Sequence, residues 1–174
     1  MKLSEVTIGK TFSVAGIEFI KFTDENGVCA AVSKDILFNS EFGENNNFAK
    51  STVLKKLNKD ILPKIEAEVG AENIKEFELD LTSLDGLDTY GKINTKIGLP
   101  TFDFYRKNVR IFAEYNPKDW WWTATPDTTK EHYNENWITC VSPLGRIFSN
   151  LYNYNSGVRP FLYFESSISV SCEE

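Results

Sequence analysis

The chain has 174 residues, of which 41% are hydrophobic and 14% aromatic, enough to build one packed core. Its formal net charge of -6 argues against a broad phosphate-binding surface, because affinity for nucleic acid depends on clustered Lys and Arg. The first residues lack the apolar stretch of a secretion signal, and no apolar run is long enough to cross a membrane. We therefore expect neither a membrane nor a nucleic-acid partner.

The N-terminal region is predicted to form a small β-meander. Apolar residues over 11–22 cluster around Ala15-Gly16, a pattern typical of a hairpin, and 28–32 continues with a short apolar strand. We assign residues 1–46 to this meander and treat it as part of the same domain as residues 47–174.

Two helices are predicted further along the chain. Ser51 is a candidate N-cap for the first, whose apolar positions 54, 57 and 61 recur at helical spacing, and Pro63 ends or kinks it. The alternating segment 77–82 predicts a strand, and Thr101 can cap the second helix. The stripe that this second helix presents to a core consists of Phe102, Tyr105, Val109 and Phe112.

Strands dominate the last third of the chain. The predicted strands are 120–125, 137–141, 146–149 and 158–164. The last is apolar on both faces, which favours a central place in its sheet, while Pro160 indicates that pairing begins after it or bulges there. The whole pattern predicts a single α+β domain in which two helices pack on short antiparallel strands.

The residues of reactive chemistry are few and scattered. Cys29, Cys140 and Cys172 form no C-x-x-C pair, so we expect structural thiols, with one disulfide as the alternative. His132 is the single histidine and is interpreted as an exposed loop residue, so no zinc site is expected. The acidic positions 80, 85 and 88 do not match the spacing of a calcium loop. We predict a protein that is not an enzyme and carries no cofactor or metal.

Tyrosine and asparagine gather in two loop segments near the C-terminus. Tyrosine offers rigid amphipathic contact area while asparagine adapts its hydrogen bonds, so the combination is typical of surfaces that bind a protein or a glycan. An ordinary surface loop, in which asparagine satisfies turns, explains the same composition. The candidate ligand-binding residues are Tyr133, Asn134, Asn136, Asn150, Tyr152, Asn153, Tyr154 and Asn155.

Several short motifs together resemble an uncharacterised domain family common in gut-type bacteria and their phages. The resemblance runs from about residue 47 to the C-terminus, and it is carried by the order and spacing of the pieces. These are Leu57-Asn58 with Ile61-Leu62, Leu84-Asp85-Gly86 with Tyr90-Gly91, Leu99-Pro100-Thr101 with Tyr105-Arg106, Trp121-Trp122-Thr123-Ala124-Thr125-Pro126, Gly157-Val158-Arg159-Pro160, and the tail Ser166-Ser167-Ile168-Ser169-Val170.

The paired tryptophans and the Gly157-Val158-Arg159-Pro160 motif resemble the ending of a C-type-lectin-like fold, shared with formylglycine-generating-enzyme relatives and phage tropism proteins. The resemblance implies that Trp121 and Trp122 lie in a core strand and that the variable surface lies between Trp122 and Gly157. Arg159 resembles a constant arginine of the family, and its neighbours Val158 and Pro160 indicate partial burial. We therefore expect a structural clamp, with a ligand contact as the alternative. Strand alternation leaves Trp120 as the tryptophan of the triplet that meets solvent. The resemblance does not supply the calcium-dependent sugar site of true C-type lectins.

Two functions from different classes follow. The first is a recognition module of a phage or mobile element that binds a protein or glycan through the Tyr- and Asn-rich loops. The alternative is an intracellular phage inhibitor of a host defence protein, consistent with an acidic, small chain. An enzyme related to the oxidases of the same fold would need reactive thiols at Cys140 and Cys172. The expected location is the host cytoplasm or the virion, and the sequence leaves the oligomeric state open.

Overall fold

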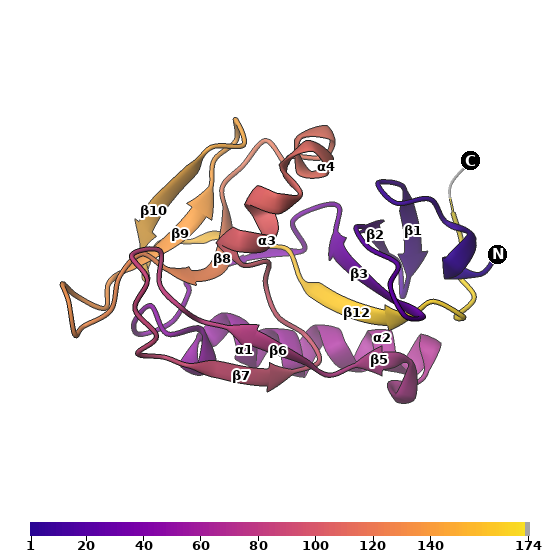
Figure 1. Ribbon diagram of the computed structural model, residues 1–174, viewed down its shortest axis with the longest axis horizontal. Helices are drawn as coiled ribbons and strands as arrows, with labels where there is room; N and C mark the ends of the chain where they lie inside the picture. The colour runs from indigo at the N-terminus through magenta and orange to yellow at the C-terminus, as the bar shows by residue number, and fades with distance from the viewer. Residues whose placement is uncertain (173–174) are drawn as a thin grey trace.

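Two five-stranded sheets lie toward opposite ends of an elongated molecule, as the computed structural model shows (Figure 1). The structure describes residues 1–172; residues 173 and 174, which end the predicted region 47–174, lie outside the described range. The first sheet has the order β1 (Thr11–Val14), β2 (Ile17–Lys21), β3 (Val28–Ser33), β12 (Phe161–Glu165) and β5 (Ile74–Lys75). Its first three strands are consecutive and antiparallel, so they form a meander.

The second sheet is formed mainly by the C-terminal third of the chain. Its order is β10 (Ile147–Leu151), β9 (Trp137–Val141), β8 (Trp121–Pro126), β11 (Ser156–Val158) and β4 (Phe38–Ser40). All its pairs are antiparallel except that of β11 with β8. Because β4 belongs to this sheet and β3 pairs with β12, residues 1–46 fold together with the rest of the chain.

The predicted strand 158–164 is two strands in two different sheets. β11 ends at Val158 and β12 begins at Phe161, so Arg159 and Pro160 carry the chain from one sheet to the other. Pro160 has no N–H to donate to a ladder, which explains why the pairing stops there. Each strand has a neighbour on both sides, as the apolar pattern predicted.

Helices and a hairpin cover the two sheets. The lower layer in Figure 1 contains α1 (Thr52–Lys56), a π-helical turn η3 (Leu57–Ile61), α2 (Leu62–Val69) and the hairpin of β6 (Phe77–Asp80) with β7 (Lys92–Thr95). The upper layer contains α3 (Phe102–Lys107) and α4 (Val109–Glu114). Short 3-10 turns are η1 (Leu3–Glu5), η2 (Phe48–Lys50) and η4 (Ala71–Asn73).

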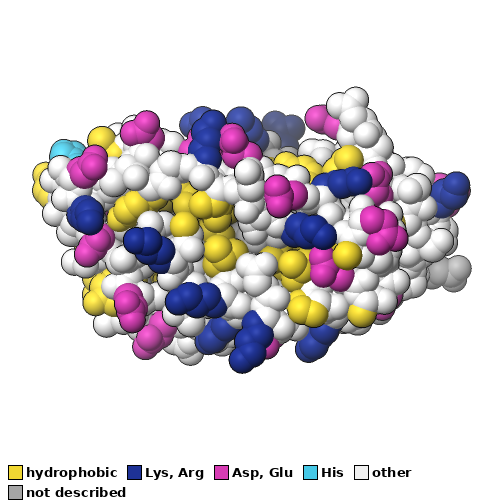
Figure 2. Space-filling view, turned by 90° about the horizontal axis from the view of Figure 1, so that it is seen from below, with side chains coloured by type: hydrophobic (Ala, Val, Ile, Leu, Met, Phe, Trp, Pro, Cys, Tyr) yellow, Lys and Arg dark blue, Asp and Glu magenta, His cyan; other side chains and the backbone are white. Residues whose placement is uncertain are grey.

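The first helical region begins as its sequence predicts. The Ser51 hydroxyl accepts a hydrogen bond from the Leu54 N–H at 3.0 Å. Pro63 does not end the helix, because the π-helical turn immediately before it accommodates the missing N–H and lets α2 continue to Val69. Seen from below, this layer shows hydrophobic patches separated by charged side chains (Figure 2).

The second helical region differs from the predicted continuous helix. Thr101 caps α3 through a hydrogen bond from the Phe104 N–H at 3.1 Å, but Asn108 leaves the helical conformation and separates α3 from α4. Tyr105 and Phe112 are buried as expected. Val109 is 45% exposed, because the break at Asn108 rotates α4 and takes this residue out of the stripe.

The tryptophan pair lies at the centre of the packing. Trp121 and Trp122 are fully buried and, as neighbours on one strand, they face opposite sides of β8. Trp121 packs under α3 and α4 with Tyr105 and Phe112, while Trp122 joins the larger core with Phe42. The described residues therefore form a single α+β domain, mostly strands, and none of their helices is long and apolar enough to span a membrane.

Candidate functional site

A depression of about 550 Å³ lies at the end of the molecule that carries the β8–β9 loop. We call it the Trp137 depression. Its lining combines aromatic rings, carboxylates, hydroxyls and an amide, which are the groups that fix orientation in ligand sites. The lining residues are Leu84, Asp85, Asp127, Thr128, His132, Tyr133, Asn134, Trp137 and Ser149.

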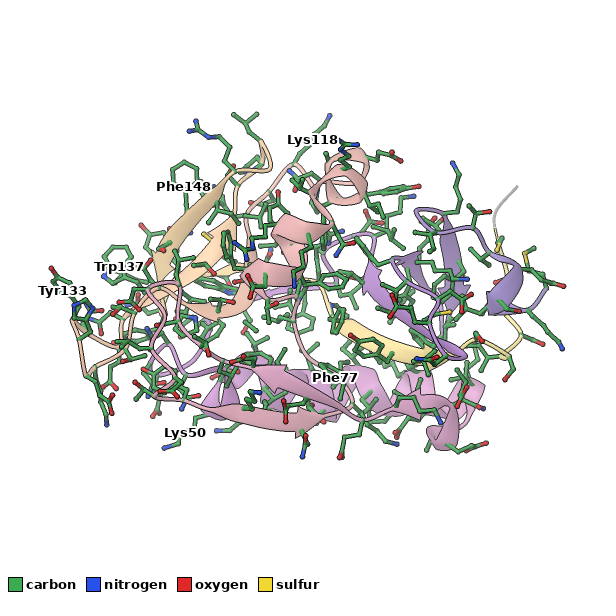
Figure 3. All side chains as sticks on the ribbon, in the orientation of Figure 1. Lys50, Phe77, Lys118, Tyr133, Trp137 and Phe148 are labelled. Carbon is green, nitrogen blue, oxygen red and sulfur yellow. The ribbon has the colours of Figure 1, made fainter. Side chains whose placement is uncertain are left out.

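Two aromatic side chains stand at this depression. Trp137 begins β9 and is 37% exposed, and Tyr133 on the preceding loop is 77% exposed. Both project from the left end of the molecule in Figure 3. An indole left accessible among polar groups gives a flat apolar surface that a ligand can cover, with large area at small entropic cost.

Asp85 holds the β8–β9 loop against the loop that follows β6. Its carboxylate accepts hydrogen bonds from Ser83 and from the Thr128 hydroxyl at 2.7 Å, and it lies 2.8 Å from His132 Nδ1. Partial burial raises the pKa of Asp85, but the hydrogen bonds of Ser83, His132 and Thr128 outweigh it and lower that pKa to about 2. The carboxylate is therefore charged at neutral pH and ties two loops together.

Asn46 braces the same loop from beneath. This residue is fully buried, and its amide N–H group donates to the carbonyls of Thr128 at 2.8 Å and Trp137 at 3.0 Å. The Tyr90 hydroxyl donates to the Asn46 side-chain oxygen at 2.5 Å, and the Asn46 backbone N–H donates to Glu135 at 2.8 Å. The loop is thus fixed before any ligand arrives, which lowers the entropic cost of binding.

The structure brings together only part of the predicted ligand-binding set. Tyr133 and Asn134 line the Trp137 depression. Asn136 is exposed next to it; its backbone N–H donates to the Asn134 side chain at 2.9 Å, and its carbonyl accepts from Tyr152 at 2.9 Å. Asn136 therefore shapes the loop through its backbone.

The remaining predicted residues lie on and after β10 and do not line the depression. Asn150 pairs with Ile138 in the ladder, and Tyr152 is half-buried against the larger core. Asn153, Tyr154 and Asn155 are exposed in the turn that leads to β11. The two Tyr- and Asn-rich segments are neighbours through the β9–β10 pair, but only residues of the first line the Trp137 depression.

His132, Asp85 and Ser149 in one depression raise the question of a catalytic triad. Such a triad needs the serine hydroxyl on the free imidazole nitrogen, with the aspartate on the other. Here the Ser149 hydroxyl donates to the Asp127 carboxylate at 2.9 Å. These three residues are therefore not arranged as a triad. The role of His132 in joining two loops was not predicted, because its sequence context is only a polar run.

The thiols are placed for packing. Cys29 and Cys140 are fully buried, and all three cysteines are free. Burial raises the pKa of the Cys29 thiol to about 11 and that of Cys140 to about 12, so both are protonated and poor nucleophiles at neutral pH. Among residues 1–172, no three His, Cys, Asp or Glu side chains gather as a metal site would require.

The Gly157-Val158-Arg159-Pro160 motif meets the tryptophans directly. Gly157 pairs with Trp121 in the parallel ladder, and its N–H donates to the Trp120 carbonyl at 2.8 Å. A Cβ on Gly157 would lie 2.8 Å from that carbonyl oxygen and would also collide with Ile36, so the approach of the two strands requires glycine. Trp120 itself is half-buried and packs edge-on against Phe148.

Arg159 of this motif is fully buried against Trp121. Its Nε donates to the Ser33 carbonyl at 3.0 Å, and its guanidinium lies 4.6 Å from the Trp121 ring centre and 5.6 Å from that of Phe112. Burial lowers the pKa of Arg159 to about 9, with the charge of Asp35 opposing the shift. The arginine therefore clamps the sheets by stacking and a single carbonyl contact.

Comparison with known proteins gives no match: no family model, no curated protein and no solved structure matches the chain.

Proposed function

We propose that the protein is a non-enzymatic recognition module that binds a glycan in the Trp137 depression. The observation that carries the proposal is an accessible indole and phenol beside fixed carboxylate, hydroxyl and amide groups. Aromatic faces cover the apolar face of a sugar ring, while Asp127, Ser149 and Asn134 offer partners for its hydroxyl groups. The bracing by Asn46 and Asp85 supports a preformed site.

We further propose that the fold is C-type-lectin-like and that the chain belongs to a phage or mobile element. Support comes from the resemblance of the motifs and from their contact in space. The residues of Trp121-Trp122 and Gly157-Val158-Arg159-Pro160 meet through the β8–β11 pair and through the stacking of Arg159 on Trp121. Because the two motifs pack against each other in the core, each needs the other, which accounts for their occurrence in one chain.

A glycan array of neutral, amino-sugar and acidic oligosaccharides tests the proposed function, with calorimetric titration of the best binder. We expect Trp137→Ala to weaken binding at least about tenfold, because the main stacking surface is lost. Tyr133→Ala should weaken it less.

Two controls match these variants. Tyr154→Ala removes a tyrosine that is 56% exposed outside the depression, and Phe148→Ala removes an exposed aromatic ring of β10. Both should bind as the wild type does. An array without any binder, or binding that survives Trp137→Ala, would contradict the proposal.

A second candidate function is the intracellular inhibitor that binds a host defence protein. It is favoured by the tip of the β9–β10 hairpin, where Leu144 is 86% exposed and Phe148 45% exposed beside Trp120. Exposed apolar side chains that cluster in this way are typical of protein contacts. Leu144→Ser would weaken the binding of such a partner and leave glycan binding unchanged, so the two candidates separate on one variant.

A further inference from the structure

We propose that the Trp137 depression is one end of an extended groove that binds a linear, uncharged or amino-sugar oligosaccharide across several sugar units. This inference rests on the proposed glycan binding and adds the size and charge class of the ligand. It starts from two further depressions, of about 290 and 200 Å³, which lie along β6, the loop after it and the start of α3.

The three depressions share lining residues and are therefore neighbours on the surface. Leu84 lines both the Trp137 depression and the middle one. Asp80, Thr101 and Asp103 line both the middle depression and the far one. Figure 3 labels Phe77, which lines the far depression, close to the middle of the molecule, and Trp137 and Tyr133, which line the Trp137 depression, at its left end.

Backbone hydrogen bonds hold the loops around these depressions together. The Leu84 N–H donates to the Pro126 carbonyl at 2.8 Å, which fastens the loop after β6 to the end of β8. The Asp127 N–H donates to the Trp137 carbonyl at 3.0 Å, which ties the end of β8 to the start of β9. The lining residues of the three depressions therefore come from segments that are fixed relative to one another.

Aromatic rings recur along the groove. Phe102 lies in the middle depression with the Arg106 guanidinium 5.8 Å from its ring centre, and Phe77 and Tyr163 line the far one. Each of the three depressions thus combines a ring with hydrogen-bonding groups. A linear glycan, which repeats an apolar face and a hydroxyl edge at every unit, matches this alternation.

The carboxylates of the middle depression have hydrogen-bond partners within the protein. The Asp80 carboxylate accepts hydrogen bonds from the Thr82 N–H at 2.9 Å and the Thr82 hydroxyl at 2.6 Å, and these bonds lower the pKa of Asp80. The Asp103 carboxylate accepts from Arg106 Nε at 2.9 Å. These carboxylates keep free lone pairs for hydroxyl donors of a ligand.

The charge of the lining selects the ligand class. Apart from His132, the charged residues that line the three depressions are Glu78, Asp80, Asp85, Asp103, Asp127 and Arg106. Carboxylates dominate this set, so a sulfated, phosphorylated or uronic acid polymer meets repulsion along the groove. An uncharged sugar chain meets hydrogen-bond acceptors, and an amino sugar adds electrostatic attraction.

The test is a length series of the sugar that the array selects, from the monosaccharide to the hexasaccharide, titrated by calorimetry. We expect affinity to rise at least about tenfold along the series, equivalent to about 1.4 kcal/mol. Phe102→Ala and Asp103→Asn should remove about tenfold from hexasaccharide binding and leave disaccharide binding within about twofold. Asp60→Asn, an exposed aspartate outside the three linings, is the matched control and should change neither.

The possible results distinguish failure of the extended groove from failure of the proposed glycan binding. Binding that depends on Trp137 but does not increase with length, or that ignores both groove variants, overturns the extended groove and leaves the proposed function standing. Stronger binding of acidic than of neutral chains also overturns it. An empty array overturns the proposed function and the groove together. Circular dichroism of each variant verifies that its fold is intact.

Discussion

The tryptophan-rich centre and the Trp137 depression differ in the interactions that hold their residues in place. They also differ in how far the sequence alone predicts them. In the centre, large side chains such as Trp121 and Trp122 are fully buried, and glycine at 157 lets two strands approach. At the depression, single polar residues such as Asn46 and Asp85 fix a loop through hydrogen bonds. The tryptophan motif thus contributes to the stability of the fold, while single polar residues outside any motif shape the surface of the depression.

The largest expected effect is on the centre. Trp122→Ala removes a fully buried indole that packs on Phe42 and donates to the Ser40 carbonyl at 2.9 Å. We expect the free energy of unfolding to fall by about 3–5 kcal/mol, which chemical denaturation measures. A loss below about 1 kcal/mol would contradict the central role of this side chain.

A smaller loss is expected where the two motifs touch. Gly157→Ala places a methyl group against the Trp120 carbonyl and Ile36, and the parallel pair of β8 and β11 must move apart. We expect a destabilisation of about 1–3 kcal/mol in the same denaturation experiment. Gly16→Ala is a less crowded control, since a Cβ there has open space, although its positive φ adds some strain.

At the depression, Asn46→Ala should lower the stability of the protein moderately and loosen the β8–β9 loop. The variant removes the side-chain donor of the Thr128 carbonyl, one of the two donors of the Trp137 carbonyl, and the acceptor of the Tyr90 hydroxyl. We expect a destabilisation of about 1–3 kcal/mol and faster amide exchange over residues 127–137. Unchanged exchange in that segment would show that Asn46 does not brace the loop.

The smallest effect is expected at Asp85, and it depends on pH. Its pKa of about 2 in the folded protein lies below the ordinary value of about 4, so its ionised form stabilises the fold above about pH 4. This contribution is lost as the pH falls from about 4 to about 2. Asp85→Asn should therefore lower the melting temperature at pH 6 by a few degrees, and the difference from the wild type should shrink toward pH 2. An equal difference at both pH values would contradict the assigned pKa.

The sequence was informative where one residue type decides the local structure. Ser51 and Thr101 cap helices, 137–141 is a strand as its pattern predicted, and Pro160 marks the end of pairing. Prediction from the apolar stripe failed at Asn108, where the backbone leaves the helical conformation and the side chain donates to the Phe104 carbonyl at 2.9 Å. The spacing of apolar residues does not report such a break, so the exposure of Val109 was not predicted.

The candidate site was predictable only in part for the same reason. Loop composition predicted Tyr133 and Asn134 as site residues. The depression that they line also needs Trp137, on the following strand, and Asp85, on a loop more than forty residues earlier in the chain. Tyr152 was predicted as a ligand contact from the composition of its loop, but its side chain packs against the larger core. Composition identifies adaptable residues, and the fold decides which of them face a common surface.

We propose that the buried tryptophan pair stabilises the fold and that the Trp137 depression binds the ligand. One variant, measured in two ways, tests this division most directly. Trp137→Ala is titrated with the oligosaccharide that binds best on the array, and its melting temperature is recorded on the same sample. We predict a loss of binding of at least about tenfold with a melting temperature within a few degrees of the wild type. Binding that persists in this variant, or that disappears only because the protein unfolds, would contradict the account.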